Sequence, residues 1–121
     1  FTAGEARVRL YGIAAPELDH TCRSVSGEAW ACGQRAAAAL RALIRSRAVE
    51  CEPKAEADQE ILGVCLVGRT DLSAWLLRQG WAELADGVGE RAYAEALTAA
   101  KHEKVGLWSE RPDGSGSSAH P

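Results

Sequence analysis

Apolar and polar side chains alternate along ARVRLYG, residues 6–12. Val8 and Leu10 fall on one face of an extended chain and the arginines on the other, which is typical of a half-buried strand. Glycine, alanine and proline then interrupt the pattern at 12–16 and predict a turn. The polar stretch that follows, 20–27, predicts an irregular loop.

Three later segments have the apolar spacing of helices. The first, 33–47, is rich in strong helix formers, and its apolar residues recur every three or four positions. The second, 72–79, follows Asp71, which is a favourable N-cap residue, and stops before Gly80. The third covers 90–104 and has its own apolar stripe. Three arginines fall on the outer face of the first helix: Arg35, Arg41 and Arg45.

Two runs of β-forming residues, 49–53 and 61–68, flank a polar stretch and predict a hairpin. In such a hairpin Cys51 and Cys65 would face each other across antiparallel strands, close enough for a disulfide. The order of strand, helix, hairpin and two helices predicts an α+β fold.

The four cysteines allow three complete pairings. Cys22–Cys32 and Cys51–Cys65 are favoured because each pair brackets a short local loop. Zinc ligation is an alternative, but the chain contains no C-x-x-C and its histidines have no ligand spacing. Four buried free thiols are the other alternative. Disulfides predict an oxidising environment, so we expect a periplasmic or secreted protein.

Length and charge limit the classes of protein that this chain can represent. The 121 residues fit one domain over 1–110, followed by a Gly-, Ser- and Pro-rich tail at 111–121 that we expect to be disordered. The formal net charge of −3 disfavours a protein held on nucleic acid mainly by bulk positive charge. No apolar run approaches the ~18 residues of a transmembrane helix, so we expect no transmembrane segment.

Five pieces of the chain, in order and at similar spacing, resemble the staphylococcal nuclease (thermonuclease, SNase-like) family. They are VRLYGIAAPE, TC…WACGQRAAAALRALI, VECEP…GVCLVG, DLSAWLLRQGWA and AEALTAAKHEKVGLWSE. The resemblance implies a five-stranded OB-type β-barrel with three helices, and we expect its N-terminal strands to be incomplete in this chain. OB-type barrels bind oligonucleotides on an open face and its flanking loops.

The resemblance also implies calcium-dependent hydrolysis of DNA or RNA phosphodiesters. That chemistry uses two aspartates to hold the cation, a glutamate near the attacking water and two arginines that neutralise the phosphate. Arg9 matches the first arginine of the family and Glu17 matches the glutamate. The first metal aspartate would belong to a segment before Phe1.

The rest of the catalytic set departs from the family pattern. Ala14 stands where the second metal aspartate is expected, and a methyl group cannot ligate calcium. The second arginine normally lies in a D-x-Y-G-R motif, but this chain reads ADQEILGVC at 57–65, with Glu60 near the position of the lost cation. Arg69 lies roughly 26 Å along that strand and cannot replace it.

Each remnant also has an ordinary structural interpretation. Arg9 could pair with Glu5 or Glu50 on the surface, and Glu17 could cap a backbone N–H. Asp19 and His20 could form a different metal site with Glu17, although such loop residues are usually solvated. Base stacking is one interpretation of the four tryptophans. We expect core positions for three of them: Trp75, Trp81 and Trp108.

The sequence therefore predicts a degenerate, catalytically impaired member of the family, a pseudoenzyme that acts as a binding or accessory module for another protein. It requires no cofactor. A calcium-dependent nuclease that uses Arg9, Glu17 and Ca²⁺ is one alternative. A nucleic-acid-binding domain that does not cleave is the other, and the net charge disfavours it.

Overall fold

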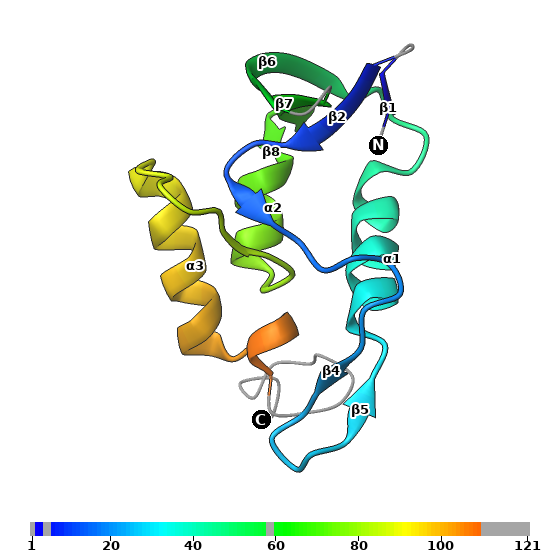
Figure 1. Cartoon of the computed structure of the whole chain (residues 1–121), viewed down its shortest axis with the longest axis vertical. Helices are drawn as coiled ribbons and strands as arrows, with labels where there is room; N and C mark the ends of the chain where they lie inside the picture. The colour runs from blue at the N-terminus through cyan, green and yellow to red at the C-terminus, as the bar shows by residue number, and fades with distance from the viewer. Residues whose placement is uncertain (1, 4–5, 58–59, 110–121) are drawn as a thin grey trace.

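The architecture is α+β, with a sheet at one end of the molecule and three helices beneath it (Figure 1). The computed structural model describes residues 2–3, 6–57 and 60–109. The predicted disordered tail, 111–121, lies outside the described residues.

The main sheet has five strands in the order β1-β2-β7-β6, with β8 also paired to β7. β2 runs parallel to β7, and the predicted hairpin joins β6 to β7 with Cys51 opposite Cys65. The strands are β1 (Thr2–Ala3), β2 (Ala6–Leu10), β6 (Glu50–Ala57), β7 (Glu60–Val67) and β8 (Thr70–Asp71). The described strands form an open sheet, so the five-stranded OB-type barrel is not confirmed.

Two small two-stranded ribbons involve residues of the predicted turn at 12–16 and of the predicted loop at 20–27. β3 (Ile13–Ala14) pairs with β9 (Glu83–Leu84), and β4 (Cys22–Arg23) pairs with β5 (Ala29–Trp30). Strands of two residues are too short to show an alternating pattern, and the partner of β3 lies far along the chain. The sequence predicted a short extended piece from Trp81 onward, where β9 lies, but it carried no local signal for how these strands pair.

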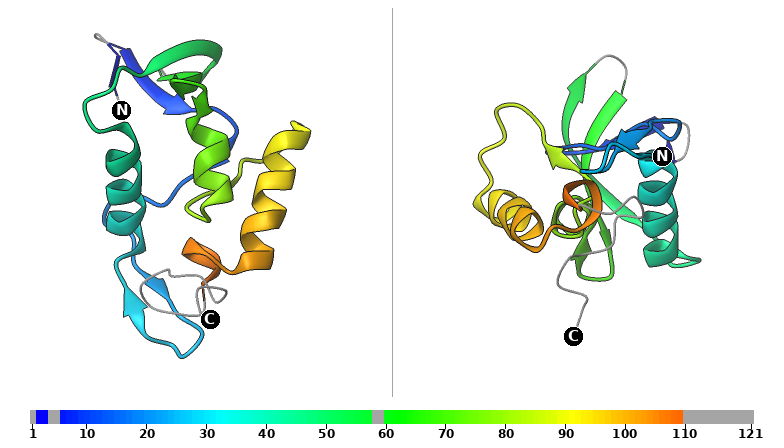
Figure 2. Two further views of the ribbon diagram at one scale, coloured as in Figure 1. Left: turned by 180° about the vertical axis from the view of Figure 1, so that it is seen from behind. Right: turned by 90° about the horizontal axis from the view of Figure 1, so that it is seen from below.

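The three predicted helices are present, with shifted ends. They are α1 (Cys32–Ile44), α2 (Leu72–Arg78) and α3 (Arg91–Glu103), and a 3₁₀ turn, η1 (Gly106–Trp108), follows. α2 lies between the other two helices when the molecule is seen from behind or from below (Figure 2). Within the described part of the chain, no helix has the length and apolarity needed to cross a membrane.

A close backbone contact links the end of α2 to η1. Gly80 and Gly106 both have positive φ, and a Cβ added to Gly80 would stand 2.1 Å from the carbonyl oxygen of Val105. The N–H of Leu107 also donates to the Gly80 carbonyl at 2.8 Å. Only glycine fits this approach, which fixes η1 against α2.

Two apolar clusters form the core. The first joins the sheet to α2 through Val8, Cys65, Val67 and Leu72. The second lies between α2 and α3 and consists of Leu76, Leu77, Ala82 and Tyr93. Trp75 and Trp81 pack against the second cluster, as predicted, and Trp30 packs against Trp81 with ring centroids 6.1 Å apart.

Candidate functional site

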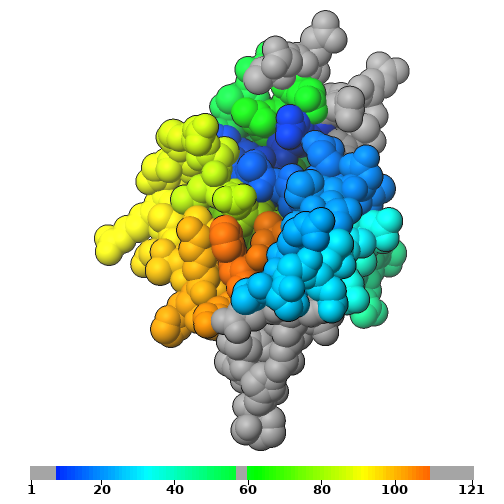
Figure 3. Space-filling model, turned by 60° about the horizontal axis from the view of Figure 1, so that its bottom comes forward, coloured from blue at the N-terminus to red at the C-terminus, as the bar shows by residue number. Residues whose placement is uncertain are grey.

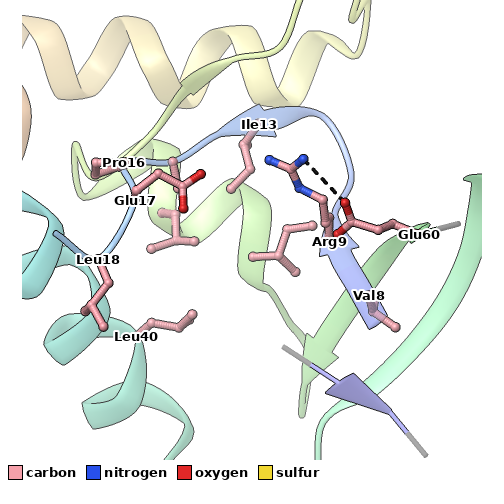
Figure 4. Close-up of a pocket in the computed structure, with 11 residues that line it drawn as sticks. Val8, Arg9, Ile13, Pro16, Glu17, Leu18, Leu40 and Glu60 are labelled. Carbon is pink, nitrogen blue, oxygen red and sulfur yellow. Dashed lines mark ion pairs between the residues drawn. The ribbon is translucent and has the colours of Figure 1, made fainter. Parts of the chain in front are cut away.

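A pocket of about 410 Å³ opens where β2 and β7 meet the segment that follows β2 (Figure 4). Arg9 and Glu17, the two predicted remnants of a catalytic set, both line it. Figure 4 shows Glu17 on one side of the pocket and Arg9 on the other, with Ile13 between them. Aliphatic side chains from β2, from the segment after it and from two helices also line the pocket: Val8, Leu10, Ile13, Leu18, Leu40 and Leu76.

Arg9 is paired with Glu60. The guanidinium Nη1 lies 3.8 Å from Glu60 Oε1, and the two side chains are 61% and 25% exposed. Arg9 stands opposite Leu62 in the parallel β2–β7 register, which brings the start of β7 beside it. The expected pairing with Glu50 is therefore wrong, and Glu5 lies outside the described residues. An exposed pair of this kind contributes about 0–1 kcal/mol to stability.

Glu17 is exposed, and its carboxylate points into the pocket (Figure 4). Its carbonyl oxygen accepts a hydrogen bond from the N–H of His20 at 2.9 Å, which shapes the following turn. Within the described residues its carboxylate has no hydrogen bond or ion pair, so the expected capping of a backbone N–H is not found. The carboxylate is available to a ligand.

Ala14 is exposed in β3 and stands opposite Glu83 in the β3–β9 ladder. Its methyl group offers no ligand atom to a metal at the corner of the turn. Asp19 forms no metal-ligand group with Glu17 and His20 among the described residues. His20 lies instead beside the sulfur atoms of Cys22 and Cys32.

Both predicted disulfides are present. The sulfur atoms lie 2.01 Å apart in Cys22–Cys32 and 2.09 Å apart in Cys51–Cys65. Zinc ligation by free cysteines and four buried free thiols are therefore wrong as alternatives. Two disulfides indicate an oxidising environment, as found in the periplasm or outside the cell.

Comparison with known proteins identifies the family. The family model described as staphylococcal nuclease homologue matches residues 7–110. The chain belongs to this family. A relative, the succinoglycan biosynthesis protein ExoI of Rhizobium meliloti (strain 1021), is 34% identical over 115 residues, which cover 92% of this chain and 59% of the relative. The chain thus spans about three fifths of the length of that curated relative.

The staphylococcal nuclease family includes calcium-dependent enzymes, so the pocket can be tested for a calcium site. Calcium takes six to eight oxygen ligands, usually with several carboxylates. Of the described residues lining the pocket, Glu17 and Glu60 carry carboxylates, and Glu60 is already paired with Arg9. One unpaired carboxylate provides too few ligands, so the described residues that line the pocket do not fit a calcium ion.

A polar network beside the pocket was only partly predicted. Asp71 caps α2 as expected, since its Oδ1 accepts from the N–H groups of Ser73 and Ala74 at 2.9 and 3.2 Å. Its Oδ2 accepts from the Tyr93 hydroxyl at 2.7 Å, and the Ser73 hydroxyl donates to the Tyr11 carbonyl at 2.8 Å. Burial and the contact with Asp71 raise the pKa of Tyr93, and a hydrogen bond with Glu90 raises the pKa of Tyr11.

The sequence did not reveal Glu60 as the partner of Arg9 or the apolar floor of the pocket. Glu60 was recognised as a charge near the missing arginine, but its contact depends on the parallel register of β2 and β7. Leu40 and Leu76 were recognisable as core-facing helix positions. Their meeting in one pocket depends on how two helices pack beneath the sheet.

Proposed function

We propose that this domain is a catalytically impaired member of the staphylococcal nuclease family that acts as a binding module. The observation that carries the proposal is the Arg9–Glu60 contact at 3.8 Å. Glu60 stands near the position where the family supplies its second arginine, and it engages the remaining one.

A phosphodiester in this pocket would meet a paired arginine and two carboxylates. Hydrolysis builds negative charge on the phosphate, and each preorganised donor that stabilises such charge is worth about 2.7–4 kcal/mol in the transition state. By the family resemblance, the chain lacks one such donor, and Ala14 offers no ligand atom where a metal-binding aspartate is expected. Together these two differences support a rate of phosphodiester hydrolysis several orders of magnitude below that of a family member with the complete set.

The pocket instead has features suited to a protein partner. Its floor is aliphatic, and the carboxylate of Glu17 projects into it without a partner among the described residues. Leu18, exposed at its edge, extends the apolar surface. We therefore propose as ligand a peptide segment with an aliphatic side chain next to a lysine or arginine.

Specific observations support two alternative functions. A calcium-dependent nuclease is supported by family membership and by the presence of Arg9 and Glu17 in one pocket. A nucleic-acid-binding domain that does not cleave is supported by exposed arginines on and directly after α1, and its binding would strengthen steeply as salt falls. Those arginines are Arg35 and Arg41 of α1 and Arg45, which follows the helix.

The proposed location is the periplasm or the cell exterior, and the disulfides support it. The rhizobial relative is named for succinoglycan biosynthesis, and that name does not refer to nucleic acids. The proposal also includes the OB-type barrel of the family, which the described strands do not close.

Repair of the pocket tests this function. Ala14→Asp, combined with a Tyr-Gly-Arg insertion before Glu60 and Glu60→Val, restores the missing ligand and donor. If the pocket lacks only this ligand and this donor, calcium affinity and plasmid nicking should both rise above those of the natural chain. Ala14→Asn with the same insertion is the matched control, because an amide is a weaker calcium ligand. A natural chain that already nicks plasmid as fast as the repaired one would contradict the proposal.

A further inference from the structure

A second pocket, of about 340 Å³, lies between the segment after β3 and η1. These two parts of the chain are adjacent on the face seen in Figure 3, in blue to cyan and in orange. Four of its lining residues carry groups that bind metals or polar ligands: His20, Cys22, Glu83 and Trp108.

His20 and Cys22 line this pocket, and Cys32 lies beside them. One imidazole nitrogen and the two sulfur atoms all lie within 4.8 Å of one another. An imidazole with two thiolates is a ligand set for a thiophilic cation such as Zn²⁺. In the disulfide form the sulfurs share a bond and cannot act as thiolates.

The backbone holds His20 in place independently of the disulfide. Its N–H donates to the Glu17 carbonyl at 2.9 Å, and its carbonyl accepts from the Gly33 N–H at 3.2 Å. Gly33 packs directly on this turn, since a Cβ added there would stand 1.9 Å from the Glu17 carbonyl oxygen. These contacts fix the backbone of His20 beside the two cysteines.

The β4–β5 hairpin also has contacts that survive the loss of the disulfide. Trp30 is buried and packs on Trp81. The Arg23 guanidinium donates to the Gly27 carbonyl at 2.8 Å, which closes the hairpin tip. Opening Cys22–Cys32 thus leaves both cysteines on anchored elements.

Cys22–Cys32 is also placed to be reduced. Cys22 is partly exposed, whereas Cys32 is buried as the first residue of α1, a helix of 13 residues. A thiolate at a helix N-terminus is stabilised by the helix dipole, so Cys32 is the better leaving group. The nucleophile is one sulfur of a dithiol, such as a thioredoxin-type protein, and it attacks Cys22. The second sulfur of the dithiol then frees Cys22, which yields two thiols here and one disulfide in the reductant.

We propose that reduction of Cys22–Cys32 by a dithiol opens a metal site formed by His20, Cys22 and Cys32. In the metal-bound form the two sulfurs would stand roughly 3.8 Å apart, the span set by tetrahedral Zn–S bonds of about 2.3 Å. The Cα atoms are 5.6 Å apart, which allows this by side-chain rotation. Binding releases the two thiol protons, and a fourth position stays open toward the pocket. This inference does not depend on the proposed function.

The test is a cadmium titration of the whole protein after limited reduction with dithiothreitol. Mass spectrometry of alkylated peptides should show that Cys22 and Cys32 are freed while Cys51–Cys65 stays closed. The reduced protein should bind one Cd²⁺ with a thiolate charge-transfer band, and the oxidised protein should show none. His20→Ala should weaken Cd²⁺ binding at least roughly 10-fold, the loss typical even of groups that only orient a ligand. His102→Ala, an exposed histidine on α3, should leave it unchanged.

Three results would overturn the inference. The first is a reduced protein without the charge-transfer band. The second is equal Cd²⁺ affinity in the His20→Ala variant. The third is loss of the near-ultraviolet circular dichroism on reduction, because the site requires the His20 turn and the hairpin to stay folded. Cys22→Ser with Cys32→Ser provides an independent check, since this variant should stay folded and fail to bind Cd²⁺.

Discussion

The polar groups around Asp71 and those around Arg9 and Glu17 belong to different parts of the chain and are held very differently. Asp71 accepts three hydrogen bonds, which tie β8 to α2 and to Tyr93 of α3. Arg9 has one exposed ion pair at 3.8 Å, and Glu17 has no partner for its carboxylate among the described residues.

The difference separates polar groups that stabilise the fold from exposed groups that are available to a ligand. Each carboxylate oxygen of Asp71 is used, so its replacement leaves donors unsatisfied in a partly buried place. Exposed groups at the pocket can be exchanged at little cost to stability. On the proposed function, the network around Asp71 is part of the scaffold, whereas the residues at the pocket determine its chemistry.

The largest expected effect is that of Asp71→Ala. The variant loses the cap of α2 and the acceptor of the Tyr93 hydroxyl, so we expect a loss of about 3 kcal/mol in the free energy of unfolding. Denaturant unfolding followed by tryptophan fluorescence measures it. Asp86→Ala, at an exposed loop position, is the matched control and should change stability by less than about 0.5 kcal/mol. Similar losses in the free energy of unfolding of the two variants would show that Asp71 stabilises the fold no more than an exposed carboxylate does.

Tyr93→Phe should have an intermediate effect of about 1.5 kcal/mol, because one hydrogen bond to a carboxylate is lost. The effect depends on pH. The pKa of Tyr93 is raised in the folded protein, so above pH ~10 the unfolded chain ionises this tyrosine first and stability falls as pH rises. Below pH ~10 Tyr93 contributes nothing to the change of stability with pH.

Unfolding experiments at pH 8 and pH 11 check this prediction. The gap between the natural chain and Tyr93→Phe should narrow at the higher pH, since phenylalanine cannot ionise. The Tyr93→Phe variant should still lose some stability at high pH, and part of that loss should come from Tyr11, whose pKa is raised by its hydrogen bond with Glu90. A gap that widens at pH 11 would contradict the assigned role of the Tyr93 hydroxyl.

The smallest effect on stability is expected for Glu60→Gln, below about 1 kcal/mol, because the Arg9 pair is exposed. Its effect on binding should be larger. The variant frees Arg9 and removes a negative charge from the pocket, so affinity for inorganic phosphate should rise. Calorimetry with phosphate measures this, and Glu56→Gln, an exposed change on β6, is the control. Unchanged phosphate affinity would show that Glu60 does not restrain Arg9.

Much of the fold could be predicted because its signals are local. The apolar spacing of α1, α2 and α3, the Asp71 cap and the Cys51–Cys65 hairpin depend on short stretches of sequence. The β3–β9 ribbon and the Arg9–Glu60 pair join residues far apart in the chain, and nothing local indicates them. The site residues Arg9 and Glu17 were found through a family resemblance, while the aliphatic floor required the packed helices.

The most direct test of the central claim is calcium calorimetry on the natural, disulfide-intact protein, followed by plasmid nicking in the same buffer. The account predicts no calcium binding in the range where an active family member binds it, and no nicking above a buffer control. Calcium binding accompanied by nicking that Glu17→Gln abolishes would contradict it. That outcome would show that the pocket of Arg9 and Glu17 is an active nuclease site despite Ala14.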